Sequence, residues 1–496
     1  MGIPKYYRGN DSNWATDANW SQSSNGPADT TFPTGVDDAI FDAFSGNCTL
    51  DAAAAALSIA IGRIGSLYGA SIGGTLNGGG FTMAVGTGGF DCTYGGSARW
   101  ILGTGIWTIS GDFDYCDIGT ITRTGSTVVL DGVGVDMIGC WNKDLYNLTI
   151  ALGASVNIPT ASQTPQMDGI VRIDGALTIT SGENFGIQAG GDLQLSSTGS
   201  IIGGIVKLYA SAEMSVCDGT FNPSLMTIGL PNSGQRYDSG PEPLSGQWQC
   251  DVLVTDSNIT TSSPYTFQLS GTVSITGSFT ARSQNVGSTL NIANSVNSPS
   301  FLIGGDISIG GVGSNGTVTW TKGTGTITLN GDAAQAVNFA GEDTEAIIVN
   351  SSDVVTFAAN TVATSFSAVA GDFDPAGYDI TVGDFTIAPG VNLISAAQGT
   401  GLWDGVTIIA GGTFSVQGNS GDYCNLQGIA GWTCYTVTVG TVRYVTVSGS
   451  SVGAGSDIRA ISSEDVSGNT GWLFSAARTL IDGGLSGGLL TSSLAA

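Results

Sequence analysis

The sequence of 496 residues contains no histidine. This absence excludes Ser-His-Asp and Cys-His nucleophilic catalysis, zinc sites with histidine ligands and a histidine-based pH switch. Lysine and arginine are scarce, 14 against 40 aspartate and glutamate residues, and the formal net charge is −26. Nucleic acids and anionic membrane surfaces both require clustered basic side chains. The composition therefore argues against both as partners.

The sequence also lacks long apolar runs. No stretch of about 20 consecutive apolar residues occurs, so no helix is expected to insert into a membrane. The first residues, MGIPKYYRGNDSNW, do not contain the apolar core of a secretory signal. We therefore expect the chain to leave its cell by a route that needs no such signal.

None of the eight cysteines belongs to a Cys-x-x-Cys pair, so a zinc ribbon is not expected. Cys92, Cys116 and Cys140 are evenly spaced along the sequence. This spacing predicts one column of a repeat with about 24 residues per turn. Two interpretations of the column are open: a stack of buried thiols, which we favour, and a disulfide.

Glycine is abundant, at 77 residues, and charged residues make up 11% of the chain. Ordinary domains have about 7% glycine and about 25% charged residues. Valine, isoleucine and threonine, which suit strands, fill much of the remaining sequence. Glycine and asparagine suit the tight corners between strands. With 41% hydrophobic residues, the composition predicts a folded all-β chain and not a disordered one.

Short alternating segments closed by Gly, Asn or Asp recur along the chain, as in IWTI at 106–109 and ITL at 327–329. One longer match joins distant regions: TGSTVVLDG and then NLTIALGASVNI (147–158) parallel TGTITLNG and then AIIVNSSDVVTF (346–357). Such internal repeats are typical of solenoids. We predict an all-β, single-stranded parallel β-solenoid, right-handed by the general preference of β crossovers. Stacked β-sandwiches are the alternative.

We expect five segments along this solenoid. At about 22 residues and about 4.8 Å per coil, the repeats would form a rod of about 19 coils and about 90 Å. The segments are an N-terminal cap or attachment module (1–50), a first solenoid block (51–230), a linker or large loop (231–247), a second solenoid block (248–472) and a C-terminal tail (473–496).

The first residues carry a pattern of aromatic and small residues, YYRGNDSNWATDANWS (6–21) and then FPTGVDDAIFD (32–42). This pattern resembles an N-terminal module of phage virion proteins and of large bacterial surface β-solenoid proteins. FDPAGYDITVGDF (373–385) and SGNTGWLF (467–474) are similar to the recurring coil and the closing motif of the same group. The resemblance implies a pectate-lyase-like parallel β-helix. The residues at the N-terminal motif positions are Gly9, Trp14, Asn19, Trp20, Pro33, Asp37 and Phe41.

The resemblance implies fold more firmly than activity, because β-helices host many functions. The group includes lyases and glycosidases as well as non-catalytic fibres and coat proteins. The absent secretion signal favours the phage branch, because assembly into a particle released by lysis needs no signal. We therefore expect a non-catalytic virion surface protein, a capsid decoration or a head or tail fibre. The alternatives are a tailspike-like polysaccharide depolymerase and a bacterial surface adhesin.

The partners implied by the resemblance are sister chains in a homotrimer and other virion proteins, such as the major capsid protein or tail proteins. Host surface glycans are the expected ligands. Trp403 and Trp432 follow glycine turns and are the candidates for stacking on sugars, although tryptophans in strands more often belong to a core.

The depolymerase alternative depends on two Asp-x-Asp pairs, Asp112 with Asp114 and Asp372 with Asp374. On a strand, side chains at positions i and i+2 share one face about 6.8 Å apart. That separation lies near the range of glycosidase carboxylate pairs, so either pair could supply an acid and a base. The competing interpretation places these residues in solvent beside glycine corners.

The second Asp pair precedes Pro375 and Gly377, which favours a turn over a catalytic strand. Either pair could also contribute to a structural Ca²⁺ site, because Ca²⁺ prefers oxygen ligands. No complete EF-hand loop occurs. We expect no other cofactor.

The two ends of the solenoid are the expected docking regions. Their aromatic residues would plug the apolar ends of the coils, and the tail would be either a docking peptide or a segment that is disordered or packed on the last coil. The docking candidates are Trp14, Trp20, Phe41, Trp472, Phe474, Leu480, Ile481, Leu485, Leu489 and Leu490.

Overall fold

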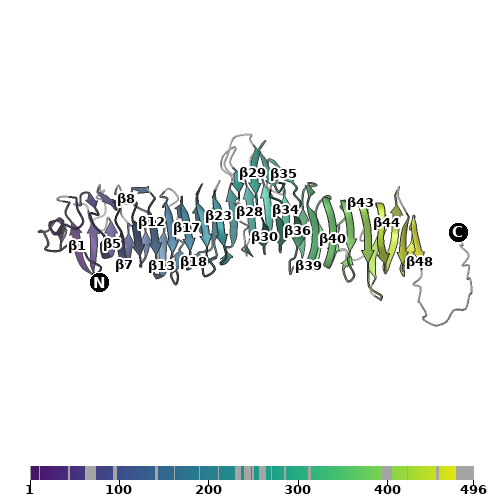
Figure 1. The fold of residues 1–496 in the computed structure, drawn as a ribbon, viewed down its shortest axis with the longest axis horizontal. Coiled ribbons are helices and arrows are strands. Elements are labelled where there is room, and N and C mark those ends of the chain that lie inside the picture. The colour runs from purple at the N-terminus through teal and green to yellow at the C-terminus, as the bar shows by residue number, and fades with distance from the viewer. Residues whose placement is uncertain are drawn as a thin grey trace, which may run out of the picture.

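The computed structural model shows a rod of stacked parallel strands, with β1 (Ile3–Tyr7) near one end and β48 (Trp472–Ser475) at the other (Figure 1). The described part of the chain contains no α-helix, only the short 3₁₀-helix η1 (Asp17–Asn19). The structure describes residues 2–475 except 10–11, 43–44, 62–73, 93–97, 124, 140–142, 161, 163, 189, 210–211, 230–235, 239–246, 249–250, 256–263, 270, 284–285, 296, 311–313, 394–404, 422 and 454–456.

One ladder of 21 parallel strands runs through the whole rod, and we call it the long ladder. At about 4.8 Å per strand it is about 100 Å long. After β1 its strands are β3 (Asp37–Phe41), β5 (Ala54–Ile61), β7 (Met83–Asp91), β10 (Phe113–Asp114), β13 (Val133–Ile138), β15 (Ser155–Ile158), β18 (Ala176–Ile179), β21 (Ser200–Ile202), β24 (Thr220–Asn222), β27 (Gln247–Trp248), β30 (Thr272–Ile275), β33 (Ser300–Ile303), β36 (Thr326–Leu329), β39 (Ala346–Phe357), β40 (Thr361–Asp374), β41 (Ile380–Ile387), β43 (Thr407–Gln417), β44 (Cys424–Arg443), β46 (Ile458–Ile461) and β48.

Shorter parallel ladders form the other sides of the solenoid. One contains β9 (Ile106–Ile109), β12 (Thr127–Leu130), β14 (Asn147–Ile150), β17 (Ile170–Ile173), β20 (Asp192–Leu195) and β23 (Glu213–Cys217). Another, which we call the second ladder, contains β16 (Gln166–Met167), β19 (Asn184–Ile187), β22 (Ile205–Leu208), β25 (Leu225–Gly229), β28 (Asp251–Thr255), β31 (Phe279–Arg282), β34 (Ile307–Ile309) and β37 (Gln335–Asn338).

Two four-stranded parallel sheets complete the sides. The second of them rises above the rod near its middle, and we call it the lateral sheet (Figure 1). The first contains β4 (Cys48–Thr49), β6 (Thr75–Asn77), β8 (Arg99–Gly103) and β11 (Thr120–Arg123); the lateral sheet contains β26 (Arg236–Asp238), β29 (Pro264–Gln268), β32 (Thr289–Ala293) and β35 (Thr317–Thr321). The remaining strands are β2 (Trp20–Ser21), β38 (Asp343–Thr344), β42 (Asn392–Leu393), β45 (Val445–Val452) and β47 (Glu464–Ser467).

The predicted parallel β-solenoid is therefore confirmed. Its strands follow from alternation: in β12, Val128 and Leu130 are buried, whereas Thr127 and Val129 are half-buried and point outward. The repeat seen in the sequence folds alike in both places. Residues 127–130 pair with 147–150, and residues 326–329 pair with 346–349, so the two copies have coils of equal length here.

The interior is filled by side chains that stack from coil to coil. The ring of Phe385 lies between those of Phe366 and Phe414, at centroid distances of 5.3 Å and 5.5 Å and interplanar angles of 18° and 8°. All three rings are buried. Because each ring covers its neighbours in the adjacent coils, the coils are joined by packing as well as by backbone hydrogen bonds.

Some corners require glycine because coils approach closely there. Gly103 has a φ of +72°, and a Cβ at this position would lie 1.7 Å from the carbonyl oxygen of Gly79 in the preceding coil. A side chain at Gly103 would therefore force the two corners apart.

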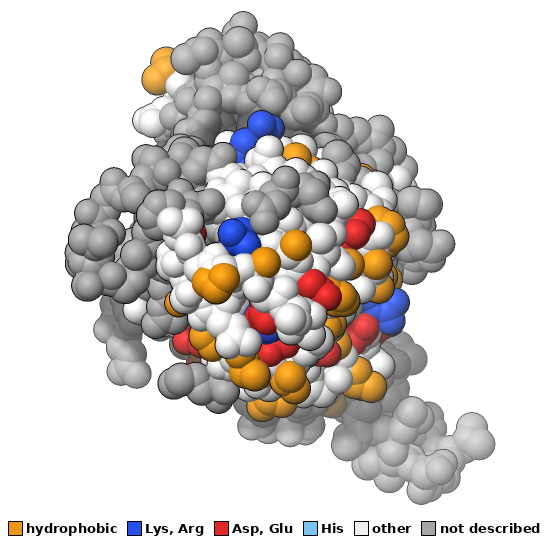
Figure 2. Space-filling model, turned by 90° about the vertical axis from the view of Figure 1, so that its left-hand side faces the viewer, with side chains coloured by type: hydrophobic (Ala, Val, Ile, Leu, Met, Phe, Trp, Pro, Cys, Tyr) orange, Lys and Arg blue, Asp and Glu red, His pale blue; other side chains and the backbone are white. Residues whose placement is uncertain are grey.

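The N-terminal end is closed by an aromatic cluster. The Trp20 ring packs at 4.9 Å from Trp14, 5.2 Å from Tyr7 and 5.9 Å from Phe41, and its indole N–H donates to the Trp14 carbonyl at 2.8 Å. All four side chains are buried. Seen from this end, the surface is mostly polar, with scattered hydrophobic and acidic side chains (Figure 2). The aromatic residues are therefore core, and the surface above them is not one continuous apolar patch.

A buried ion pair holds the segment after β2 against the first strand. Lys5 and Asp29 have side chains that are 3% and 8% exposed and form a salt bridge. The Lys5 ammonium also donates to the Thr31 hydroxyl at 2.7 Å. Because both charges are nearly out of water, each depends on the other for compensation.

The opposite end carries a smaller aromatic group. Trp472 packs edge-on against Trp432 at 6.2 Å and stacks on Phe474 at 6.1 Å. Its indole N–H donates to the Ser450 hydroxyl at 2.9 Å. Nearby, β47, which pairs with β45, is exposed at every residue.

The segment 231–247, expected to be a linker or large loop, contributes β26 to the lateral sheet and part of β27 to the long ladder. The long ladder passes this region through β24, β27 and β30. The division into two blocks stays a prediction. No helix among the described residues is long and apolar enough to cross a membrane.

Candidate functional site

The first Asp pair lies on the long ladder. Phe113 of β10 is fully buried, Asp112 before it is exposed and Asp114 after it is half-buried. Alternation therefore points both carboxylates outward, on the same side of the strand. Each is engaged with backbone: the Asp112 carboxylate accepts the N–H of Asp136 at 2.9 Å and that of Asp114 accepts the N–H of Cys116 at 3.0 Å.

Two other acidic side chains lie near Asp114. Asp114 is paired in register with Asp91 of the preceding coil. Burial raises the pKa of Asp114 above its ordinary value, and the negative charges of Asp91 and Asp117 raise it further. An exposed carboxylate beside one that protonates more readily is the asymmetry that acid–base chemistry uses. The pair therefore has a suitable charge arrangement, although both carboxylates also serve the backbone.

Asp372 and Asp374 lie in the last residues of β40, and the turn that the sequence favours for them begins only after the strand, at Pro375. β40 ends at Asp374, which is buried, and its carboxylate accepts the N–H of Ala376 at 2.8 Å. The Tyr378 N–H then donates to the Pro375 carbonyl at 2.9 Å. A buried carboxylate that closes a turn is not available to a substrate, so the catalytic interpretation of Asp372 with Asp374 is wrong.

No group of three or more Cys, Asp or Glu side chains in the described part of the chain is placed to hold a metal ion. The structural Ca²⁺ site stays a prediction. The acidic neighbours of Asp114 supply charge but not a closed set of oxygen ligands.

Trp432, a candidate for stacking on glycans, is 2% exposed. The strand β44 continues through Gly431, so alternation turns Trp432 inward together with Cys434, and its indole N–H donates to the Ser448 carbonyl at 3.2 Å. Its proposed role in glycan stacking is therefore wrong. Trp403 lies outside the described residues.

The cysteine column differs from the favoured stack of thiols. Cys92 is a buried thiol, whereas Cys116 is half-buried and disulfide-bonded. The register pairs Phe90 with Phe113 and Asp91 with Asp114, which brings Cys92 level with Tyr115 and not with Cys116. The expectation of one thiol column is therefore wrong. The strand pairing advances by one residue less per coil than the sequence spacing of Cys92 and Cys116. Cys140 lies outside the described residues.

The docking candidates of the first end are closed off from partners. Trp14, Trp20 and Phe41 are 1%, 0% and 4% exposed. They cannot contact a partner without unfolding of the cap, so their role is to close the core. Trp472 is 8% exposed and Phe474 is half-buried. The tail candidates Leu480, Ile481, Leu485, Leu489 and Leu490 lie outside the described residues.

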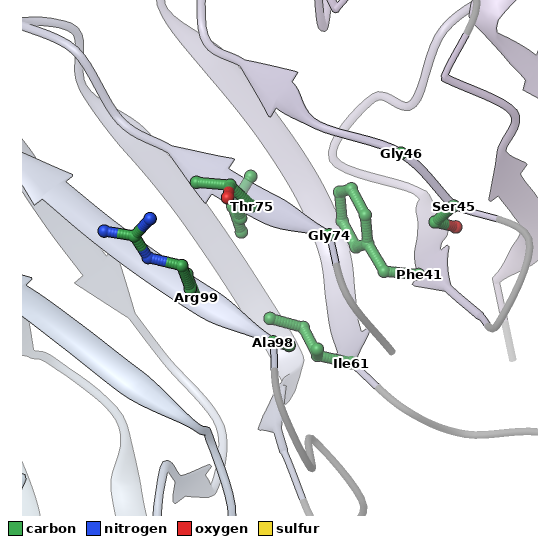
Figure 3. A pocket seen from close by; sticks show the side chains of 9 residues that line it. Phe41, Ser45, Gly46, Ile61, Gly74, Thr75, Ala98 and Arg99 are labelled. Carbon is green, nitrogen blue, oxygen red and sulfur yellow. The ribbon is translucent and has the colours of Figure 1, made fainter. Parts of the chain in front are cut away.

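A small pocket opens beside the N-terminal cap (Figure 3). Its free space is about 10 Å³, which is room for about one water molecule and not for a sugar. The Arg99 guanidinium points away from the Phe41 ring (Figure 3). The pocket is lined by Phe41, Ser45, Gly46, Ile61, Gly74, Thr75, Leu76, Ala98 and Arg99.

The long ladder carries a regular surface that was not predicted from the sequence. In seven consecutive strands, one paired stretch of each strand points two side chains outward, which gives two rows of seven. These strands are β30, β33, β36, β39, β40, β41 and β43. Ten of the fourteen are Ser or Thr, and we call these fourteen residues the hydroxyl face. Recurrent segments such as TVSI, TITL and TFSV carried this signal. The face consists of Thr272, Ser274, Ser300, Leu302, Thr326, Thr328, Ala346, Ile348, Ser365, Ser367, Asp384, Thr386, Thr413 and Ser415.

Comparisons with known proteins give no further guide: no protein family, no curated protein and no solved structure matches this chain.

Proposed function

We propose that this chain is a non-catalytic structural protein of a phage virion surface, a capsid decoration or a head or tail fibre. The observation that carries the proposal is the long ladder, in which parallel pairing continues from β1 to β48. A chain that devotes its length to one rod of about 100 Å is built to span a distance. Each end of this rod carries its own aromatic cluster, around Trp20 at the N-terminal end and around Trp472 at the other.

The mechanism is mechanical. Stacked rings such as Phe366, Phe385 and Phe414 join successive coils, so bending the rod would open core contacts as well as hydrogen bonds. The net charge of −26 keeps copies of the protein from sticking together nonspecifically. The rod would hold one end on the particle and present the other, with its sides, to the surroundings.

The partners follow from the resemblance in the N-terminal sequence. They are other virion proteins, such as the major capsid protein or tail proteins, sister chains in a homotrimer, and host surface glycans. Since the cap aromatics are buried, attachment at the first end would use the polar surface over them (Figure 2).

The test is immunogold electron microscopy of phage particles from the source, with an antibody against this chain. Gold on heads supports a decoration protein, and gold on tails supports a fibre. Particles that carry the protein by mass spectrometry but bind gold nowhere on their surface would contradict a surface location. Particles without the protein would contradict the virion role and leave the adhesin and free-enzyme alternatives.

A second candidate function is the depolymerase, favoured by one observation: Asp112 is exposed beside Asp114, whose pKa is raised by burial. Host-capsule polysaccharide is incubated with the protein, and new reducing ends are counted. In this alternative, Asp112→Asn and Asp114→Asn each lower the rate by at least about 100-fold, whereas Asp332→Asn, at an exposed corner, leaves it unchanged. No cleavage by the parent protein excludes this candidate for the polysaccharide tested.

A further inference from the structure

One corner of the solenoid carries an aromatic residue in a strained backbone conformation. Tyr444 is the single residue between β44 and β45, and its φ is +51°. This left-handed region suits glycine and is costly for a residue with a bulky side chain. Eight non-glycine residues in the described part of the chain have a positive φ, and Tyr444 is the only aromatic residue among them.

The next coil shows that the fold does not need an aromatic ring at this corner. Arg443 pairs with Ile461, which places Ser462 at the position of Tyr444 in the following coil. Ser462 has nearly the same φ, +52°, so a small side chain makes the same corner there. Strained residues that a fold keeps without need are characteristic of functional sites. The ring of Tyr444 therefore calls for a role outside the packing of the coils.

A second tyrosine lies beside the first. Cys424 pairs with Val445, so Tyr423 of the preceding coil is level with Tyr444. The centroids of the two rings lie 5.9 Å apart at an interplanar angle of 49°, and both side chains are half-buried. Neither phenol hydroxyl has a hydrogen-bond partner within the part of the chain that the structure describes. The pair thus presents apolar ring surface together with two hydroxyl groups that are available to a ligand.

An arginine is held against this pair. The guanidinium carbon of Arg443 lies 5.9 Å from the centroid of the Tyr444 ring, which is a cation–π contact. Its side chain is exposed, and it forms no salt bridge with any described residue, although the chain contains 40 acidic residues. Gln417, which is half-buried, pairs with Arg443 from the preceding coil. We call Gln417, Tyr423, Arg443 and Tyr444 the corner site.

The chemistry of the corner site suits a sugar ring. The faces of aromatic rings carry partial negative charge and attract the C–H groups of a pyranose. Guanidinium, amide and phenol groups supply donors and acceptors for its hydroxyls. Single-stranded nucleic acids also stack on aromatic rings, but the net charge of −26 repels them and disfavours acidic saccharides as well. We infer that the corner site binds a neutral pyranose unit of a saccharide.

The position of the corner site agrees with a role in recognition. β44 lies near the end of the rod that is opposite to the N-terminal cap (Figure 1). A rod that is attached by its first end would therefore present this corner to the surroundings. Sugar binding here extends the proposed function and rests on it for one point, the origin of the sugar in a host glycan.

The experiment is saturation-transfer-difference NMR on the full chain. The probes are neutral oligosaccharides of glucose, galactose or mannose, and oligosaccharides that contain glucuronate. Tyr444→Asn removes the ring and keeps the corner, because asparagine tolerates the left-handed conformation. Arg443→Gln removes the guanidinium at an exposed position. The control is Tyr146→Ala, which removes a ring that is 40% exposed on a distant coil. Thermal unfolding by circular dichroism compares the stability of all variants.

We expect saturation transfer to the ring C–H protons of a neutral oligosaccharide, with equal affinity in the parent and in Tyr146→Ala. Tyr444→Asn should weaken binding at least about tenfold without lowering the melting midpoint, because relief of backbone strain offsets the lost packing of the ring. Arg443→Gln should weaken binding about fivefold. If Tyr444→Asn does not fold, Arg443→Gln decides alone.

Unchanged binding in Arg443→Gln and in a folded Tyr444→Asn would overturn the corner site. Binding of the glucuronate probes alone, or of no probe, would overturn the neutral sugar as its ligand. These outcomes are distinct from failure of the proposed function. Gold on particles whose protein binds no sugar leaves the virion role standing, and sugar binding by a protein that is absent from particles leaves the corner site standing.

Discussion

Trp320 donates its indole N–H to the carboxylate of Glu345 at 2.7 Å, and both side chains are buried. The other oxygen of the same carboxylate accepts the Gly323 N–H at 2.8 Å. Trp320 lies in β35, the last strand of the lateral sheet, and Glu345 directly precedes β39 of the long ladder. A single buried carboxylate therefore ties the lateral sheet to the shaft of the rod.

Replacing Glu345 should loosen this junction. Glu345→Ala leaves the buried indole N–H of Trp320 and the half-buried N–H of Gly323 without this acceptor and should lower the free energy of unfolding by about 2 to 4 kcal/mol. Glu345→Gln, with one carbonyl oxygen, satisfies only one donor and should fall between Ala and the parent. Thermal unfolding by circular dichroism measures both. Glu464→Ala, in the exposed strand β47, is the control, and equal midpoints for Glu345→Ala and Glu464→Ala would refute the role of this carboxylate.

Acid should weaken the N-terminal cap. The hydrogen bond from Lys5 holds the pKa of Asp29 below its ordinary value of 3.8. A carboxylate with a lower pKa in the folded state stabilises the fold above its unfolded pKa, and this contribution is lost as the pH falls through the folded pKa. The melting midpoints of the parent and of Asp29→Asn should therefore differ most near pH 6, begin to converge below about pH 4 and meet only once the pH is below the lowered pKa of Asp29. A difference that is constant with pH, or one equal to that of the exposed-site variant Asp332→Asn, would contradict the ion pair as its cause.

The sequence predicted the solenoid because alternation and glycine corners act locally, and β12 and β36 fold as their shared pattern requires. It could not predict the length of each coil. Phe366 pairs with Phe385, and Phe385 pairs with Phe414, yet the second of these coils is much longer than the first. These lengths depend on corner loops that the strand pattern does not encode.

The thiol column was wrongly predicted because the length of the coil was unknown. The glycan-stacking role of Trp432 was wrongly predicted because the length of its strand was unknown. The sequence predicts a turn at Gly431, but Gly431 lies within β44 with a positive φ of 97°, and the strand continues beyond it. The core position of Trp432 therefore depends on the neighbouring coils, not on its local sequence. The hydroxyl face was missed for a similar reason: its rows exist only once the register between distant strands is known.

Two buried thiols should resist alkylation in the folded protein. Burial raises the pKa of the Cys434 thiol to about 12 and raises that of the Cys92 thiol well above its ordinary value. Because the thiolate is the reactive form, iodoacetamide near pH 8 should leave both unmodified in native protein and modify both in denaturant. Peptide mass spectrometry gives the extent at each site. Native labelling of either one at the rate of a free peptide thiol would show that its coil opens.

Removing the central ring of the N-terminal cap should disturb that end of the rod alone. Trp20 is fully buried against three aromatic neighbours, and Trp20→Ala should cost about 3 to 5 kcal/mol of local stability. In a solenoid each coil contacts only its neighbours, so the loss should fade within a few coils. Hydrogen exchange by mass spectrometry should show faster exchange in β1 and β3 and unchanged exchange in β40 and β41.

The matched control for this experiment is Tyr435→Ala, which removes an aromatic ring that is 39% exposed on β44. Since that ring is partly in solvent, its removal should cost far less and should leave the cap as protected as in the parent. Faster exchange along the whole rod in Trp20→Ala would mean that the coils unfold as one unit. The cap would then nucleate the entire ladder instead of closing one end of it, and loss of the cap would abolish the rod on which the proposed function depends.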